Sequence, residues 1–236
     1  MKFVDPLISG RLIKRYKRFL ADVELENGKL VTAHCANSGS MRSINQAGSE
    51  VWLSPAQNPN RKLKFTLELI KLNKSYIGVN TALPNLIVEE AIRNKKISEL
   101  EGYSNLRREV KYGKNSRIDI LLEDQDRSNC YVEVKSVTMK RGLKKSDPVE
   151  FPDAVTKRGT KHLSELTEMV AKGHRSVMFY LVQRQDSDFF TIAADIDPDY
   201  NTALEKAIAA GVEVVCYQCK LDTKRIEILR PLKLSL

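Results

Sequence analysis

The segment Ser116–Met139, SRIDILLEDQDRSNCYVEVKSVTM, constrains the fold of this chain more than any other. Two apolar, strand-like stretches flank a short polar loop, which is typical of a β-hairpin. Asp119 lies in the first stretch, and Glu133 and Lys135 lie in the second. A charged side chain on a largely buried sheet is strongly unfavourable unless it is paired or binds a metal. These three charges therefore require an explanation.

Strand geometry predicts that the three charges meet. Side chains alternate along a strand, so Glu133 and Lys135 share one face while Val134 takes the other. If the loop turns near Asp126, antiparallel pairing places Asp119 opposite Glu133, with Cβ atoms about 5 Å apart. Two carboxylates in one place suit Mg²⁺ or Mn²⁺, and the carbonyl of Val134 can add a further oxygen ligand.

This group of side chains allows two interpretations. Two carboxylates beside an amine are suited to metal-assisted hydrolysis of a phosphodiester, with Lys135 holding or deprotonating the attacking water. Cross-strand ion pairs are also common on solvated sheets. The spacing alone favours neither the catalytic site nor the plain salt bridge.

The positive charge of the chain is concentrated in its first third. The formal net charge is +9; residues 1–80 hold 13 Lys and Arg against 6 Asp and Glu, whereas residues 81–236 hold 26 against 24. A chain of 236 residues is long enough for two domains. We expect a basic domain at 1–80 and a nearly neutral one at 81–236. Such charge fits a polyanion, and nucleic acid is favoured over a membrane because no basic amphipathic anchor helix is evident.

Nothing in the sequence indicates membrane insertion or export. No apolar run approaches the roughly 20 residues that a bilayer requires. Asp5 and Pro6 stand where a signal peptide would carry its apolar core. Cys216 and Cys219 form a C-x-x-C, but in a strand-like segment this spacing directs the two thiols to opposite faces. We therefore expect a cytoplasmic protein without a cysteine metal or redox site.

The first 80 residues have the pattern of a small β-barrel. Short apolar stretches, separated by turn signals such as Asn27-Gly28, predict strands. The expected strand ranges are 7–13, 18–25, 29–35, 50–54, 65–72 and 75–79, with a short helix near 41–46. Five or six strands in so short a segment are typical of an OB-type barrel, and such barrels commonly bind oligonucleotides on one face.

Cations and aromatic residues alternate in the segment RLIKRYKRF. Its predicted nucleic-acid contacts are Arg11, Arg15, Tyr16, Lys17 and Arg18. Cations can follow the phosphates of a strand while an aromatic ring stacks on a base. The alternative is that Tyr16 belongs to the barrel core and that the cations only solvate an edge strand.

Residues 81–236 alternate helices and strands around the hairpin. A helix that carries Glu89 and Glu90 is predicted to begin near Pro84. A second helix is predicted to follow Asp153, its expected N-cap, and to end at Gly173. Strands at 107–112, 176–183, 212–219 and 225–229 and a last helix at 199–210 complete a mixed sheet flanked by helices.

The second helix carries a basic face formed by Lys157, Arg158 and Lys161. These cations can hold a phosphate near the metal. The alternative is an exposed face with i, i+4 ion pairs, which is the usual role of such spacing.

Asp119 on one strand and Glu133-Val134-Lys135 on the next resemble the PD-(D/E)XK nuclease superfamily. The resemblance implies that the aspartate and the glutamate hold a metal and that the lysine assists the attacking water. It also implies an acid on the preceding helix, for which Glu90 is the choice by position, and a basic or polar residue on the following helix, for which Lys161 or Lys157 is the choice. Ile118 stands where the motif has proline.

Longer segments are similar to the bacterial sugar fermentation stimulation protein A family over nearly the whole chain. These segments are RYKRFLADV, AHCANSGSM, the hairpin and FPDAVTKRGTKHLSEL. The resemblance implies an N-terminal OB-like β-barrel followed by a PD-(D/E)XK nuclease-like mixed sheet flanked by helices. It also implies DNA as a partner, which we expect to be bound with little or no sequence specificity.

We therefore expect a DNA-binding protein with a Mg²⁺- or Mn²⁺-dependent phosphodiesterase (nuclease) site. The main alternative is a non-catalytic transcriptional regulator that retains the nuclease fold for DNA contact. A third interpretation is that the polar pocket senses a phosphorylated metabolite, which would connect the protein to sugar use.

Overall fold

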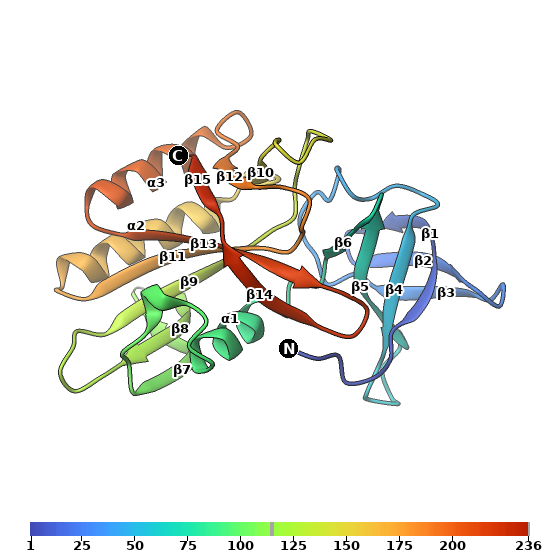
Figure 1. Ribbon diagram of the computed structural model, residues 1–236, viewed down its shortest axis with the longest axis horizontal. Helices are drawn as coiled ribbons and strands as arrows, with labels where there is room; N and C mark the ends of the chain where they lie inside the picture. Colours follow the sequence, from blue (N-terminus) through green and yellow to red (C-terminus); the bar gives the residue numbers. More distant parts are fainter. Residues whose placement is uncertain (114–115, 236) are drawn as a thin grey trace.

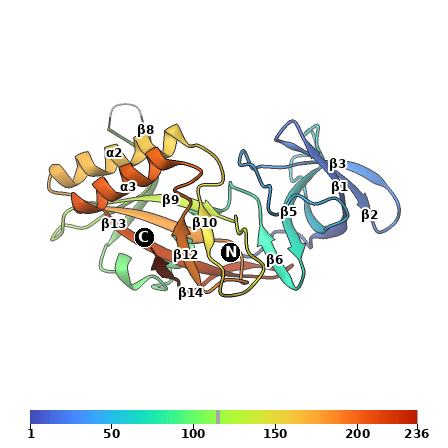
Figure 2. The same cartoon turned by 90° about the horizontal axis from the view of Figure 1, so that it is seen from above.

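The computed structural model describes residues 1–113 and 116–235, which form two halves lying side by side (Figures 1 and 2). The first half contains six strands: β1 (Ile8–Tyr16), β2 (Leu20–Leu25), β3 (Leu30–His34), β4 (Glu50–Pro55), β5 (Phe65–Leu72) and β6 (Ser75–Gly78). Their order is β3-β2-β1-β4-β5-β6, and a further pairing of β3 with β5 closes the sheet. This is the predicted OB-like barrel.

The barrel strands alternate between the core and the solvent. Leu12, Ala21 and Val23 are fully buried, whereas Arg11 and Glu24 on the same two strands are exposed. The alternation explains why this segment forms barrel strands, because Leu12, Ala21 and Val23 face the core while the charged residues between them face the solvent.

Two details of the barrel differ from the prediction. β1 continues to Tyr16, so the basic segment forms one β1–β2 hairpin with Lys17-Arg18 at its turn. The segment near 41–46 forms turns rather than a short helix, with the amides of Ile44 and Asn45 both donating to the Met41 carbonyl.

The second half is built on a six-stranded mixed sheet in the order β14-β13-β11-β9-β8-β7. Its strands are β7 (Asn105–Tyr112), β8 (Ser116–Glu123), β9 (Cys130–Val137), β11 (Arg175–Val182), β13 (Glu213–Leu221) and β14 (Ile226–Pro231). β9, β11 and β13 run parallel, and the outer strands pair antiparallel. A small parallel sheet that was not predicted consists of β10 (Val149–Phe151), β12 (Phe189–Ile192) and β15 (Lys233–Ser235).

Helices cover both faces of the six-stranded sheet (Figure 1). α1 (Pro84–Arg93) and the 3-10 helix η1 (Ser98–Leu100) pack on one face, and α2 (Lys157–Ala171) and α3 (Pro198–Ala209) pack on the other. The hydroxyl of Thr156 accepts a hydrogen bond from the Gly159 amide at 3.0 Å and caps α2. The predicted N-cap, Asp153, lies before this residue and has another role.

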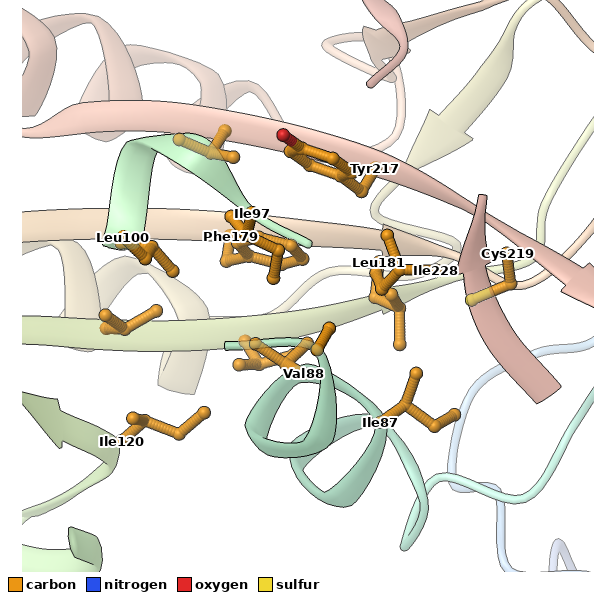
Figure 3. Close-up of a cluster of buried hydrophobic side chains, with 14 of the residues drawn as sticks. Ile87, Val88, Ile97, Leu100, Ile120, Phe179, Leu181, Tyr217, Cys219 and Ile228 are labelled. Carbon is orange, nitrogen blue, oxygen red and sulfur yellow. The ribbon is translucent and has the colours of Figure 1, made fainter. Parts of the chain in front are cut away.

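The central strand β11 is apolar from residue 177 to its end because both of its faces are buried. Phe179 and Leu181 pack toward α1, and Figure 3 shows both on the side of the sheet that faces Ile87 and Val88. The alternate residues Met178 and Tyr180 pack toward α2 and α3. β9, which carries Glu133 and Lys135, pairs with β11 and is therefore held between two hydrophobic clusters.

The C-x-x-C motif is divided between these two clusters. Cys216 belongs to the cluster under α2 and α3, and Cys219 to the cluster under α1, as the spacing on a strand predicts.

Each helix in the described part of the chain is too short or too polar to span a bilayer.

Candidate active site

The ladder between β8 and β9 has the predicted register but ends just before Asp119. Ile120 pairs with Val132, which corresponds to a turn centred at Asp126. Side chains two apart on a strand normally share a face. Ile120 packs in the cluster under α1, however, whereas Ile118 packs in the cluster under α2. The face on which the side chains of β8 pack therefore changes between Ile118 and Ile120, and Asp119 lies at this change.

The carboxylate of Asp119 fills the gap left by the interrupted ladder. Its Oδ2 accepts a hydrogen bond from the backbone amide of Val134 at 2.7 Å, and its Oδ1 accepts one from the side-chain amide of Asn85 at 2.8 Å. A residue's N–H and C=O point to the same edge of a strand, so the carbonyl of Val134 also faces this gap. Asn85, near the start of α1, has no signal in the sequence that would identify it.

Glu133 and Lys135 share the face of β9 that α2 covers, as predicted. The ammonium of Lys135 donates to Glu133 Oε1 at 2.6 Å, and Nδ1 of His162 on α2 hydrogen-bonds the same oxygen. Glu133 is only 2% exposed, and its Oε2 has no hydrogen-bond partner within residues 1–113 and 116–235. A buried carboxylate oxygen without a partner is unfavourable, so a cation at Oε2 would be stabilising.

The two carboxylates differ in proton affinity. Burial, followed by the negative charge of Glu133, raises the pKa of Asp119 to about 6. Burial acts to raise the pKa of Glu133 as well, but Lys135 and His162 outweigh it and the pKa of Glu133 is lowered. Both groups are therefore largely ionised at neutral pH, which favours a bound cation.

The donor set fits a hard divalent cation. Asp119 and Glu133 offer carboxylate oxygens and Val134 offers a carbonyl oxygen, which are the ligands that Mg²⁺ and Mn²⁺ prefer. Among the residues that the structure describes, no three His, Cys, Asp or Glu side chains form a ligand cluster. Further ligands would therefore come from water or substrate, as is usual for Mg²⁺.

Glu90 does not reach this site, contrary to the prediction. Its Oε1 accepts a hydrogen bond from the N-terminal ammonium of Met1 at 2.7 Å, and its side chain is half-exposed. Glu89 pairs instead with Arg108 at 2.8 Å. Each residue turns a helix by about 100°, so Glu90 points away from the side on which Asn85 meets the site.

α2 presents Arg158 and His162 to the site rather than Lys157 and Lys161. Nε of Arg158 donates to Nε2 of His162 at 3.3 Å, and both residues line the cavity. Lys161 lies 3.6 Å from Glu165, and Lys157 does not line the cavity. The prediction that Lys157 or Lys161 lies near the metal site is therefore wrong, and Arg158 lines the cavity together with His162, because residues four apart share one helix face.

A cavity of about 530 Å³ opens onto these residues at the junction of the two halves. Arg18 and residues 37–39 of the barrel form one wall, and residues 150–156, which precede α2, form another. Asp119 and Glu133 lie in the same cavity. The barrel therefore contributes directly to the site, which the separate motifs did not predict.

The basic segment of the barrel is divided between structural and solvent-facing cations. Arg15 donates to the carbonyls of Asn37 at 2.7 Å and Gly39 at 3.0 Å, so it holds a loop instead of facing a ligand. Lys17 and Arg18 are exposed at the hairpin turn.

Arg11 and Tyr16 are also engaged within the barrel. Arg11 donates to the carbonyl of Gly48 at 3.1 Å and lines a different cavity. The hydroxyl of Tyr16 donates to Asp22 at 3.1 Å, and the ammonium of Lys14 lies 5.3 Å from its ring centre. Arg18 is therefore the member of the predicted set that lines the candidate active site.

Known proteins resemble this chain over its whole length. Residues 13–79 match the family model described as the SfsA N-terminal OB domain, and residues 82–225 match that of the sugar fermentation stimulation protein RE domain. The sugar fermentation stimulation protein homolog of Rhodospirillum rubrum is 58% identical over 95% of each chain. That of Paramagnetospirillum magneticum is 55% identical over 100% of this chain and 98% of the relative.

A solved structure has the same fold. It is described as Pyrococcus furiosus SfsA in complex with Ca²⁺, and it aligns with a TM-score of 0.88 and 24% identity over 100% of this chain and 98% of that chain. The alignment supports the arrangement of a barrel followed by a mixed sheet with helices.

Proposed function

The chain belongs to the sugar fermentation stimulation protein family, and on this basis we propose that it is a DNA-binding protein with a metal-dependent phosphodiesterase site. One observation carries the proposal: Asp119, Glu133 and Lys135 meet in one cavity beside a Val134 peptide that is free of the β8 ladder. A fold alone does not assign an activity. The proposal rests on this group of side chains and on the positive charge of the barrel.

Asp119 and Glu133, with the carbonyl of Val134, are the residues that would hold Mg²⁺ or Mn²⁺. Such an ion supplies charge that stabilises a phosphoryl oxygen and activates water. The Pyrococcus furiosus relative is described with Ca²⁺, which also takes oxygen ligands. The unpartnered Oε2 of Glu133 is the feature of this chain that supports a cation here.

The cations of the site have separate roles in this proposal. Lys135 is only partly buried, at 14% exposure, so its ammonium can hold a water in the cavity while it remains paired with Glu133. Arg158 lies in the first turn of α2 and lines the cavity. A helix N-terminus favours an anion, so Arg158 and the start of α2 together would bind the phosphate.

A DNA-binding regulator without turnover is the second function that an observation favours. The ammonium of Lys135 already balances the charge on Glu133 Oε1. The ion cluster can therefore stabilise the fold without a metal. In this case the cations of the barrel bind DNA, and neither Asp119 nor a divalent ion affects binding.

Incubation of the purified protein with plasmid, linear and branched DNA in Mg²⁺ or Mn²⁺ tests the proposal. We expect cleavage that EDTA, Asp119→Ala and Lys135→Ala each abolish, while Asp126→Ala in the exposed hairpin loop cleaves like the parent. Cleavage that survives in both site variants would contradict the catalytic assignment. Salt-dependent DNA binding that is unaffected by Asp119→Ala, without cleavage, would favour the regulator.

A further inference from the structure

The wall between the cavity and the barrel is a fixed loop. Arg15 donates to three acceptors in it, the carbonyls of Asn37, Gly39 and Ser40, at 2.7, 3.0 and 3.3 Å. The side-chain amide of Asn37 donates in turn to the carbonyl of Val79 at 3.1 Å. This loop is therefore positioned by the barrel before any ligand binds.

The same loop is attached to the opposite half of the molecule. Oδ2 of Asp153 accepts hydrogen bonds from Ser40 Oγ at 3.3 Å and from the Met41 amide at 3.2 Å. Two sides of the cavity are thus tied together next to the carboxylates. Its volume of about 530 Å³ is that of a small-molecule pocket and is large enough for nucleotide-sized groups.

The β1–β2 turn beside this cavity has a strained backbone. Lys17 and Arg18 have φ angles of 48° and 60°, so both adopt the left-handed conformation. They belong to the three-residue turn at 17–19, between the paired residues Tyr16 and Leu20, and a residue with a Cβ is disfavoured in the left-handed conformation. The chain nevertheless places two exposed cations at these positions, and Arg18 lines the cavity. Strain of this kind is typical of functional sites.

The third residue of this turn carries an exposed aromatic ring. Phe19 is 46% exposed, and its ring stacks on that of His34 with centroids 6.5 Å apart and an angle of 22° between the planes. An exposed, supported ring beside a cation is the arrangement with which proteins bind single strands, because the ring stacks on a base and the cation contacts a phosphate.

We propose that the cavity takes a single strand of DNA, with a base stacked on Phe19 and the neighbouring phosphate at Arg18. The strand passes between the barrel loop and the segment before α2 and presents a phosphodiester to Asp119 and Glu133. The paired bases of a duplex are excluded by the two tied walls. This inference rests on the proposed function and specifies its substrate class.

Fluorescence anisotropy with a labelled oligonucleotide tests the inference under conditions without cleavage, in EDTA and separately in Ca²⁺. We expect the full chain to bind the single strand at least tenfold more tightly than the duplex of the same sequence. Phe19→Ala should weaken single-strand binding by about tenfold, the usual effect of losing one stacked base, and leave duplex binding unchanged. Phe19→Trp should retain it. Leu30→Ala, which removes an apolar side chain that is 67% exposed elsewhere on the barrel, is the control.

Arg18→Gly separates a binding role from a structural one. Glycine relieves the left-handed strain, so we expect this variant to unfold at a higher temperature and still bind the single strand more weakly. A purely structural turn would gain stability without losing affinity.

The outcomes separate this inference from the proposed function. Equal or tighter duplex binding, or a Phe19→Ala effect that is the same for both forms of DNA, overturns the inference while DNA binding stands. Tighter binding of an RNA strand of the same sequence overturns the assignment to DNA. Absence of binding to either DNA form overturns both proposals. Absence of cleavage together with an intact single-strand preference overturns the proposed phosphodiesterase activity and supports the inference.

Discussion

The carboxylate of Asp119 takes the place of a backbone acceptor for Val134, whose amide donates to it at 2.7 Å. The pairing of β8 with β9 ends at Ile120 and Val132. Beyond this pair, the side chain of Asp119 accepts the hydrogen bond that a backbone carbonyl of β8 would otherwise accept. The left-handed φ of Glu109, 55°, on the neighbouring strand β7 shows that the sheet is distorted on this side as well. The distortion brings the half-buried carboxylate of Asp119 to the edge of the Val134 peptide, which a regular hairpin would pair with the backbone of β8.

Asp119→Asn should stabilise the metal-free protein at neutral pH. The pKa of Asp119 is raised from 3.8 to about 6, so the folded state holds this proton more tightly than the unfolded chain. Its contribution to stability is therefore fully present below about pH 4 and is lost as pH rises to about 6. The shift corresponds to about 1–3 kcal/mol, which the variant should recover at pH 7.5. Urea unfolding in EDTA at pH 4 and pH 7.5 measures the difference.

The control for this prediction is Asp126→Asn, the same chemical change in the exposed hairpin loop. A gain in stability that is equal at the two pH values, or equal in the two variants, would contradict the assigned cause. Calorimetry with Mn²⁺ should at the same time show that Asp119→Asn loses the divalent ion.

Glu133→Gln should have the opposite effect on stability. Its Oε1 accepts a hydrogen bond from Lys135 at 2.6 Å and another from His162, both in a buried environment. Removing one charge of a buried pair leaves the other uncompensated, so we expect a loss of about 3 kcal/mol at pH 7.5. Urea unfolding of Glu133→Gln/Lys135→Met should show that the second change recovers part of this loss. A double variant that is less stable than the single one would rule out this explanation.

The sequence predicted what depends on local geometry. The position of the loop at Asp126 determines the register of the hairpin, and strand alternation then places Glu133 and Lys135 on one face. Neither rule gives the rotation of a helix about its axis, and for that reason Glu90, Lys157 and Lys161, which were predicted at the site, do not line its cavity. Asn85, Arg158 and His162 occupy the corresponding places in the structure.

Contacts between distant segments could not be predicted from the sequence either. Arg15 belongs to a basic segment whose charge suggested a nucleic-acid contact, but backbone carbonyls of a loop more than 20 residues later use its guanidinium. Asp153 has the sequence context of an N-cap, and its partners are Ser40 and Met41 of the barrel. Only packing of the two halves brings these groups together.

His162 should position Glu133 for the metal. Arg158 Nε donates to Nε2 of His162, so the ring proton lies on Nδ1 and is donated to Glu133 Oε1, which leaves Oε2 for a cation. Loss of such a supporting hydrogen bond commonly lowers metal affinity about 10- to 100-fold. Calorimetric titration with Mn²⁺ should show this loss in His162→Ala and a smaller one in His162→Gln, which can still donate. Unchanged affinity in both variants would contradict the positioning role.

Gly39→Ala should loosen the junction between the two halves. A Cβ at this position would lie 2.5 Å from Asp153 Oδ2, too close for the present arrangement, so the hydrogen bonds from Ser40 and Met41 to Asp153 would have to lengthen. We expect a loss of about 1–2 kcal/mol in the free energy of unfolding, as is typical of overpacking. The double variant Gly39→Ala/Asp153→Ala tests the cause, because removal of the carboxylate makes room for the new methyl group. Its loss should be smaller than the sum of the two single losses by about 1 kcal/mol, whereas additive losses would mean that Gly39 and Asp153 do not interact.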